Sequence, residues 1–196
     1  MAQFYAQILL DFMDALEIAQ ANLFAGTPGV GQIIHLANRH PERVAKLILQ
    51  CGPGLGRSMF TPPPTEGSRL SGAVRKDINY ENVLELMKSM IPRDDHRTEE
   101  IVMDRYLAAV DPSVNEARPR ITGPREDISA ELPQIAQPTL IIWGIHERDV
   151  PFDMGLRAAT LIPNARFHVF GDKTGHFPNI ERASEFNRLV IDFLSH

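Results

Sequence analysis

Two short apolar runs place the narrowest limits on what this chain can fold into. Lys46-Leu-Ile-Leu-Gln-Cys51 is almost continuously apolar, and Thr139-Leu-Ile-Ile-Trp143 is a second strand-like run. The first run is typical of a strand that is buried on both faces of a parallel sheet. The segments around both runs alternate between helix-like and strand-like patterns, which predicts an α/β fold.

The other expected elements follow from apolar periodicity and from helix stop signals. Helical spacing predicts helices, and short apolar runs predict strands. The expected order is a helix over 4–18, a strand over 22–26, a helix that stops before Pro41, and, after the run at 139–143, a helix over 153–161, a strand over 166–170 and a helix over 182–194.

The middle of the chain breaks this alternation. Glycines at 52, 54, 56 and 67 and the three prolines at 62–64 mark a boundary. Two helices are expected beyond it, over 80–91 and 98–110, the second with Thr98 as its N-cap. Because no strand separates them, we expect a helical lid over 53–133, inserted between core parts at 1–52 and 134–196.

Composition narrows the class of protein. With 43% hydrophobic and 23% charged residues the chain is an ordinary globular protein. A net charge of -5 gives no attraction for nucleic acid or for an anionic membrane surface. No window is apolar enough to span a membrane, and the start of the chain lacks the features of a signal peptide, so a cytoplasmic protein is expected.

The single cysteine, Cys51, has no partner for an intrachain disulfide, and its place at the end of an apolar run predicts a packing role. No group of histidine, cysteine and acidic residues has the spacing of a metal site. We therefore expect no metal and no cofactor.

A glycine-rich turn, Ala25-Gly-Thr-Pro-Gly-Val-Gly-Gln-Ile33, follows the strand expected at 22–26 and leads into a helix. Such a turn can hold either a phosphate or a catalytic nucleophile. Gly26 and Gly31 have the spacing that opens a Walker A loop, but Gln32-Ile33 stands where that loop needs Lys and Ser or Thr. This mismatch disfavours nucleotide binding.

Several motifs of the chain are similar to those of a known family. The chain resembles the α/β-hydrolases that cleave carbon–carbon bonds in meta-cleavage products of aromatic degradation, which are vinylogous 1,5-diketo acids hydrolysed to a dienoate and an acid. The resemblance implies an α/β-hydrolase-type, mostly parallel sheet that lacks the first strands of the family, with a helical lid. It runs in order over nearly the whole chain, through "LLDFMDALEI", "AGTPGVG", "HPERVAKLIL", the lid stretch around "PTEG", and "EFNRLVIDFL" near the end.

The resemblance places Thr27 at the position of the nucleophile. Threonine keeps a hydroxyl, but its β-branching crowds a turn in which the backbone is already strained. The alternative is that Thr27 is a polar turn residue that caps the next helix. Pro28 stands where the family donates a backbone N–H to the oxyanion, and proline has none; loss of one such donor costs about 2.7–4 kcal/mol of transition-state stabilisation.

The resemblance also implies a base and an acid. His176, in Gly175-His-Phe177, stands at the position of the catalytic histidine. Counting back from Val150-Pro151 gives Glu147 as the acid that orients it, with Asp149 as a competitor. The other interpretation of this segment is a solvated, charged loop.

Three further residues match or depart from the substrate contacts of the family. Arg105 matches the arginine that binds the substrate carboxylate, a role that suits a planar guanidinium; a solvent-facing helix arginine is the alternative. Gly26 replaces a polar asparagine beside the nucleophile. Phe177 replaces a tryptophan that lines the pocket.

Three functions stand open at this stage. They are carbon–carbon bond hydrolysis of a small-molecule carboxylate, binding or assembly by a catalytically impaired homologue, and carboxylesterase-like hydrolysis in the same pocket. The second gains weight from Thr27, from Pro28 and from the missing His-Gly-Gly oxyanion loop. The strand at 22–26 is expected to present an unpaired apolar edge, through which we predict a homo-oligomer.

Overall fold

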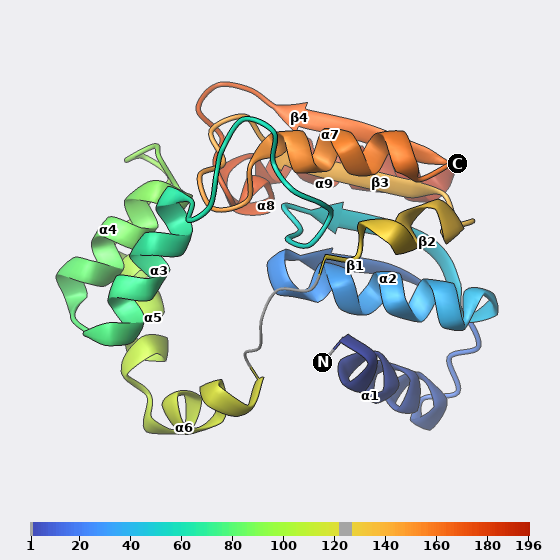
Figure 1. Ribbon diagram of the computed structural model, residues 1–196, viewed down its shortest axis with the longest axis horizontal. Helices are drawn as coiled ribbons and strands as arrows, with labels where there is room; N and C mark the ends of the chain where they lie inside the picture. Colours follow the sequence, from blue (N-terminus) through green and yellow to red (C-terminus); the bar gives the residue numbers. More distant parts are fainter. Residues whose placement is uncertain (1, 122–126) are drawn as a thin grey trace.

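The computed structural model describes residues 2–121 and 127–196 and is built around a parallel sheet. Its four strands are β1 (Ala21–Gly26), β2 (Val44–Gln50), β3 (Thr139–Gly144) and β4 (Ala165–Phe170), in the order β1-β2-β3-β4 (Figure 1). The α/β fold expected from the sequence is confirmed.

The register of the sheet brings the carboxyl ends of the strands to one edge. Gly26 lies opposite Gln50, Gln50 lies opposite Ile142, and Gly144 lies opposite Phe170. The residues that directly follow each strand therefore gather at this edge, which is where ligands bind in open α/β sheets.

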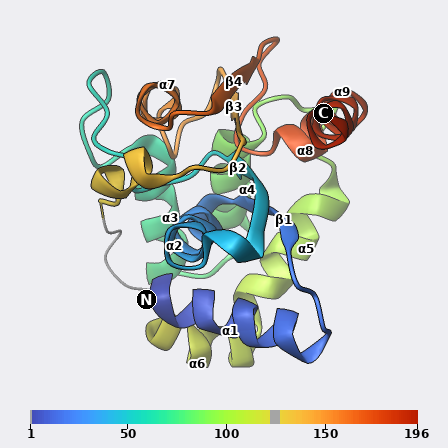
Figure 2. The same cartoon turned by 90° about the vertical axis from the view of Figure 1, so that its right-hand side faces the viewer.

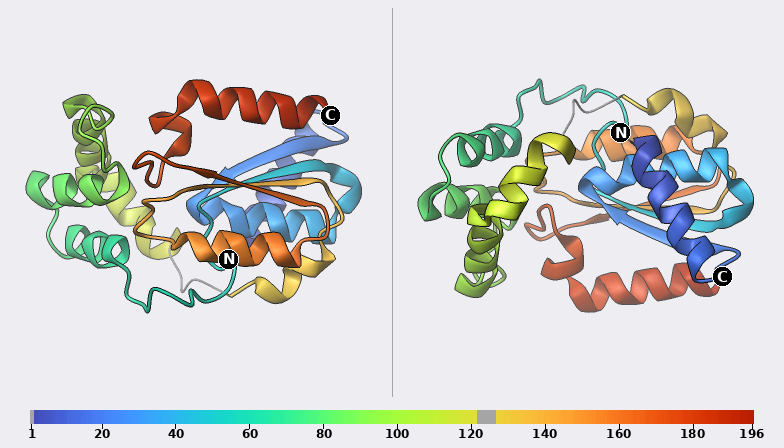
Figure 3. Two further views of the ribbon diagram at one scale, coloured as in Figure 1. Left: turned by 90° about the horizontal axis from the view of Figure 1, so that it is seen from above. Right: turned by 90° about the horizontal axis from the view of Figure 1, so that it is seen from below.

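Both faces of the sheet are covered by helices (Figure 3). Alternate residues of β2 and β3 divide between two cores, because successive side chains of a strand point to opposite faces. One face packs against α2 (Val30–Arg39) and α7 (Phe152–Leu161), and the other against α9 (Ala183–Ser195). The first core includes Leu47, Leu49, Ile141, Trp143, Ile34 and Ala158, and the second includes Ile48, Leu140, Ile142, Phe186 and Phe193.

Among the described residues between β2 and β3, four α-helices form a group beyond the carboxyl ends of the strands (Figures 1 and 2). They are α3 (Glu66–Lys76), α4 (Tyr80–Met90), α5 (Glu99–Val110) and α6 (Pro112–Ile121). The expected α4 and α5 are present, and the Thr98 hydroxyl caps α5 by accepting a hydrogen bond from the N–H of Ile101. The expectation missed α3 and α6. The boundaries 53 and 133 of a separate lid stay a prediction.

These helices, which we call the helical insertion (residues 66–121), have a hydrophobic core of their own. Among the described residues its buried members include Val83, Leu86, Met87, Ile91 and Val102. The helical insertion therefore packs chiefly on itself rather than on the sheet.

The first helix, α1 (Ala2–Ala15), buries a different face from the one its apolar pattern suggests. Ala6, Leu10 and Met13 are buried, and the helix packs along α2. A second apolar row, spaced every four residues, faces solvent instead. This exposed row consists of Phe4, Ile8, Phe12 and Leu16.

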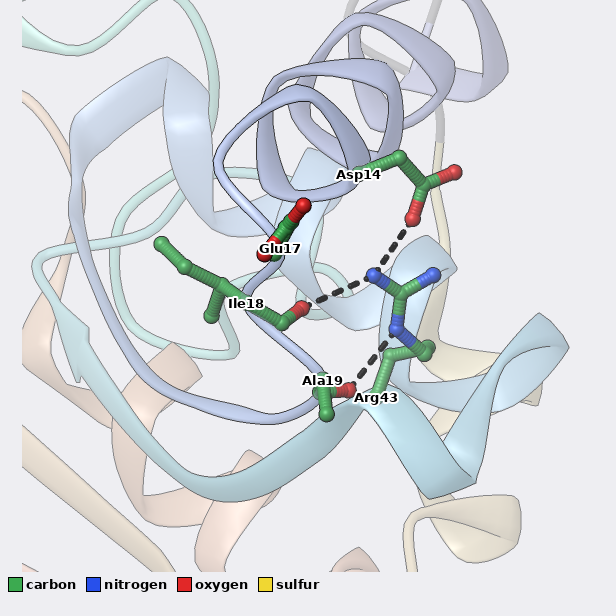
Figure 4. A pocket seen from close by; sticks show the side chains of 5 residues that line it. All are labelled: Asp14, Glu17, Ile18, Ala19 and Arg43. Carbon is green, nitrogen blue, oxygen red and sulfur yellow. Dashed lines mark hydrogen bonds and ion pairs between the residues drawn. The ribbon is translucent and has the colours of Figure 1, made fainter.

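A small pocket lies at the opposite end of the sheet, where α1 leads into β1 (Figure 4). The Arg43 guanidinium binds this turn. It donates hydrogen bonds to the carbonyls of Ile18 and Ala19 at 3.0 and 2.8 Å and forms an ion pair with Asp14 at 2.7 Å. Because these polar groups bind one another, we interpret the pocket as a structural contact that holds the loop between α1 and β1, and not as a ligand site.

Four short helical turns complete the chain: η1 (Thr27–Gly29), η2 (Pro41–Arg43), η3 (Ser129–Gln134) and α8 (Pro178–Glu181). Among the described helices, none combines the length and the apolar character that a membrane span needs.

Candidate active site

The turn after β1 has the backbone of a strained strand-to-helix elbow. Gly26 is extended, and Thr27 then takes a φ of +47°, in the left-handed region that β-branched residues rarely enter. A residue is held in such a conformation only where its surroundings enforce it, and such residues cluster at functional sites. Thr27 is partly exposed at the carboxyl edge of the sheet.

Pro28 and Gly29 complete this turn, and α2 begins at Val30. A helix N-terminus offers unpaired N–H groups and a positive dipole end to an anion. Pro28 contributes no N–H here, and the N–H of Val30 already donates to the carbonyl of Thr27. The elbow therefore has the shape of an oxyanion site with fewer donors than that shape usually carries.

Glu147 and His176 meet at the same edge. A Glu147 carboxylate oxygen is hydrogen-bonded to His176 Nδ1. The other carboxylate oxygen accepts from the N–H groups of Asp149 and Val150 at 2.6 and 3.1 Å. The side chains of Glu147 and His176 are 0% and 2% exposed, so the pair is shielded from water.

The electrostatics of Glu147 favour its charged form. Burial acts to raise the pKa of the Glu147 carboxyl, but the charge and hydrogen bond of His176, with the two N–H donors, outweigh burial and leave the pKa below its ordinary value of 4.5. Glu147 is therefore a carboxylate at neutral pH, as an orienting acid must be.

This geometry distinguishes between the interpretations of residues 144–149. A solvated charged loop does not describe it, because the side chain of Glu147 is fully buried. The competitor Asp149 is also buried, but Glu147 is the residue hydrogen-bonded to the ring of His176.

A buried carboxylate that the sequence did not single out holds the loop of His176. Both oxygens of Glu181 accept from the N–H of Gly175 at 3.0 Å, and one of them also accepts from Phe177 at 3.2 Å. The two donors flank His176. Burial, and to a lesser degree the nearby Glu147, raise the pKa of the Glu181 carboxyl above its ordinary value of 4.5, against the effect of these N–H groups.

Gln50 joins the elbow to the histidine loop. Its amide nitrogen donates to Asn179 Oδ1 at 2.9 Å and to the carbonyl of His176 at 3.4 Å. A Cβ added to Gly26 would lie 3.6 Å from this same nitrogen. The amide of Gln50 therefore holds the loop of His176 and lies beside Gly26, the residue before Thr27.

The "PTEG" stretch fastens the helical insertion to the loop of Glu147. Thr65 Oγ1 donates a hydrogen bond to the carbonyl of Asp149 at 2.9 Å, and the N–H of Gly67 donates one to the main-chain carbonyl of Arg148 at 3.0 Å. Gly67 also lies so close that a Cβ there would approach the Cβ of Asp149 to 2.5 Å. A glycine is needed at this position because two segments of chain pass in contact.

Comparisons with known proteins identify the family. A 2-hydroxy-6-oxononadienedioate/2-hydroxy-6-oxononatrienedioate hydrolase from Paraburkholderia phymatum is 36% identical over 194 residues, which are 96% of this chain and 67% of that protein. The chain belongs to the meta-cleavage product hydrolases.

Further relatives agree with this assignment, although protein-family models give no match. A 2-hydroxy-6-oxo-6-phenylhexa-2,4-dienoate hydrolase from Comamonas testosteroni is 34% identical over 194 residues, covering 96% of this chain and 68% of that protein. A variant of the meta-cleavage product hydrolase CumD from Pseudomonas fluorescens IP01, solved with acetates, superposes with a TM-score of 0.85 at 29% identity, over 99% of this chain and 71% of that one.

Two residues that were predicted to contact the substrate differ in their surroundings. The ring of Phe177 stands edge-on to that of His176, with centroids 4.8 Å apart, and packs against the core of the helical insertion. Arg105 lies at an exposed position of α5. The structure brings Phe177 to the candidate catalytic pair and leaves Arg105 on the surface of the helical insertion.

The fold also brings together three side chains of metal-ligand type that have no metal-site spacing in the sequence. Cys51 follows β2 and is fully buried, and its sulfur, a Glu147 carboxylate oxygen and a His176 ring nitrogen lie within 4.8 Å of one another. No local sequence signal could have joined Cys51 to residues so far along the chain.

Proposed function

We propose that this chain hydrolyses a carbon–carbon bond in a dienoic keto acid formed by meta-cleavage of an aromatic ring. The buried hydrogen bond between Glu147 and His176, at the sheet edge that also carries the strained Thr27, is the observation that supports it. Membership of the meta-cleavage product hydrolases supplies the reaction class.

In this proposal each residue has a distinct task. Glu147 accepts a hydrogen bond from Nδ1–H of His176, which fixes the tautomer and makes Nε2 the ring nitrogen that takes up a proton. Thr27 Oγ1 loses its proton to Nε2 as it attacks the carbonyl carbon of the substrate, and His176 returns the proton to the leaving fragment when the C–C bond breaks. A water molecule, which gives a proton to Nε2, then attacks the acyl group on Thr27; His176 returns that proton to Thr27 Oγ1 as the acid product leaves. The carboxylate of Glu147 stabilises the charged ring between these steps.

We assign substrate binding to the elbow and to the helical insertion. The names of both relatives describe hydrolases of acids that carry a carboxylate, and Arg105 is the side chain that we propose for binding it. Gly26, Pro28 and Phe177 would line the reacting end of the pocket.

The elbow favours a second candidate, a homologue with impaired catalysis that acts by binding or assembly. Pro28 removes an oxyanion donor, and Thr27 adds a methyl group in a left-handed conformation. Members of a catalytic set act as a unit, so these two changes can cost more together than either alone.

One experiment separates the two candidates. Turnover of a yellow meta-cleavage product and of a chromogenic ester is measured for the unaltered protein, for T27S, for P28M, for the T27S/P28M double variant, and for each of these with H176A. Turnover by the unaltered protein that H176A abolishes supports the hydrolase. Turnover that begins only in the double variant supports the impaired homologue, and turnover of the ester alone favours a carboxylesterase.

The same assay tests the assignment of the acid. We expect E147Q to lower kcat by roughly 10⁴-fold, because an amide stabilises the wrong tautomer of the histidine. D149N is the matched control, since it removes an equal charge two residues away and leaves the partner of His176 in place. Equal losses in both variants would contradict Glu147 as the orienting acid.

A further inference from the structure

Cys51, Glu147 and His176 come from three different strand ends and converge in the interior. Cys51 directly follows β2, Glu147 lies in the turn after β3, and His176 lies in the loop after β4. Their sulfur, oxygen and nitrogen atoms lie within 4.8 Å of one another. The proposed hydrolase uses two of the three, which leaves the thiol without a task.

The thiol is poorly placed to be a nucleophile. Cys51 is 0% exposed, and its sulfur lies 4.0 Å from the carbonyl oxygen of Ile142, so it faces the interior of the sheet. Burial, and then the neighbouring Glu147 carboxylate, hold the pKa of the Cys51 thiol well above its ordinary value of 9.0. A buried neutral thiol attacks carbonyl carbons slowly.

The three groups do match the ligands of a soft divalent cation. Zn²⁺ takes thiolate, imidazole and carboxylate ligands at about 2.0–2.3 Å, which puts ligand atoms of a tetrahedral site about 3.5 Å from one another. A site of one thiolate and one carboxylate also neutralises the charge of the ion, as a buried site requires. The two N–H groups that hold one oxygen of Glu147 leave its other oxygen directed at His176 and available as a ligand.

We propose that Cys51, Glu147 and His176 form an inhibitory binding site for a soft divalent cation such as Zn²⁺. The cation replaces the proton of the Cys51 thiol, which is released to solvent, and occupies Nδ1 of His176. The proton of the neutral ring then lies on Nε2, the nitrogen that must be free to act as a base. Cation binding stands without the proposed function, whereas the inhibition rests on it.

Metal binding is measured first, by equilibrium dialysis of the full chain against Zn²⁺, and Co²⁺ serves as a spectroscopic probe. We expect one tightly bound ion per chain and a sulfur-to-cobalt charge-transfer band in the near ultraviolet. C51S keeps the size of the side chain and removes the thiolate. We expect it to lose the band and to weaken binding by more than the roughly 10–100-fold that follows loss of an outer-shell partner.

A matched variant checks for adventitious binding to surface histidines. His146 is exposed and lies beside Glu147, so H146Q should leave the affinity and the band unchanged. Equal affinity in C51S and the unaltered protein, a missing charge-transfer band, or weaker binding in H146Q than in C51S would each overturn the site.

Inhibition is then measured as each protein's rate with Zn²⁺ divided by its own metal-free rate. We expect the unaltered protein to lose most of its rate at Zn²⁺ concentrations that leave C51S unaffected. If the unaltered protein binds the ion at Cys51 but turns over no substrate, the metal site stands and the proposed function fails. If it binds the ion and retains its full rate, the inhibitory role is wrong.

Discussion

Glu181 holds the histidine loop by accepting hydrogen bonds from main-chain N–H groups on both sides of His176. Its ability to accept these hydrogen bonds stabilises the fold, whereas its buried negative charge is unfavourable. Its oxygens satisfy the N–H groups of Gly175 and Phe177, which would otherwise be buried without partners. Its charge, however, is buried near Glu147, and burial first and this neighbour second raise its pKa. The residue is needed as an acceptor more than as an anion.

Substituting Glu181 should separate these two properties. E181A leaves two N–H groups unpaired, and each should cost about 1–3 kcal/mol of unfolding free energy. E181Q keeps one acceptor oxygen, which already receives both N–H groups, so its loss should be much smaller. Denaturant unfolding at neutral pH measures both, and equal losses would contradict the acceptor role.

The pH dependence of the unfolding free energy gives a second comparison, between the unaltered protein and E181Q. Because the pKa of Glu181 is raised in the folded state, the folded protein keeps a proton that the unfolded chain releases as pH rises above 4.5. The stability of the unaltered protein relative to E181Q should therefore fall as pH rises from 4.5 to the raised pKa, and stay constant above it. A difference that rises with pH over this window would show that the carboxylate is stabilising.

At the scale of the elements, the first turn of α3 contacts the loop of Glu147, and the helix also packs against α4 of the helical insertion. Two glycines on this helix differ sharply in their surroundings. A Cβ on Gly67 would lie 2.5 Å from the Cβ of Asp149 and 2.8 Å from its Cα, whereas a Cβ on Gly72 would meet nothing within 4 Å. The two positions form a matched pair on one helix.

We expect the same substitution to have opposite effects at these two positions. G72A should stabilise the protein by about 0.5–1 kcal/mol, because alanine favours a helix over glycine. G67A should destabilise it by about 1–3 kcal/mol, since the loop of Glu147 must shift to admit the methyl group. Thermal unfolding of the two variants measures the difference, and stabilisation of both would show that α3 does not press on this loop.

The elements that the sequence predicted well are those whose signal is local. The runs at 46–51 and 139–143 are strands because their apolar character needs no partner to be recognised. Helix α3 escaped prediction because Gly67 and Gly72 lower its helix propensity and three prolines precede it. The sequence did not decide which face of α1 is buried, because two apolar rows compete on it and only packing against α2 decides between them.

The site divides in the same way. The resemblance to the family singled out Glu147 and His176, by counting back from Val150-Pro151 and by the Gly-His pair, and the structure brings these two side chains into a hydrogen bond. Gln50 could not be singled out, since its contact with the carbonyl of His176 joins residues 126 positions apart. Glu181 was missed because a glutamate in a helical turn is usually exposed, and nothing in the sequence shows that it accepts hydrogen bonds from the N–H groups of Gly175 and Phe177.

At the scale of the whole molecule, the helical insertion rests on the two loops that carry the candidate catalytic pair. "PTEG" contacts the loop of Glu147, and the carbonyl of Met90 accepts from the N–H of His176 at 2.7 Å. Phe177 extends from beside His176 into the core of the helical insertion. A movement of the helical insertion would therefore reach both members of the pair directly.

The sheet has one edge at β1. Among the described strands β1 pairs only with β2, and its Phe24 is 50% exposed. A separate apolar surface is the exposed row of Phe4, Ile8, Phe12 and Leu16 along and just after α1. An apolar strand edge is a template for pairing with another chain. We expect a second copy of the chain to pair there, so sedimentation at micromolar concentration should show a concentration-dependent dimer.

Three single lysine substitutions locate that contact. N22K places a charge on β1 and should shift the protein toward monomer, because an edge lysine blocks strand pairing. F12K tests the alternative that the exposed row of α1 makes the contact, and Q134K is the control, since it adds the same charge at an exposed position on η3. A dimer lost in F12K but kept in N22K would assign the interface to α1, and a chain that stays monomeric without any substitution would show that the β1 edge does not pair.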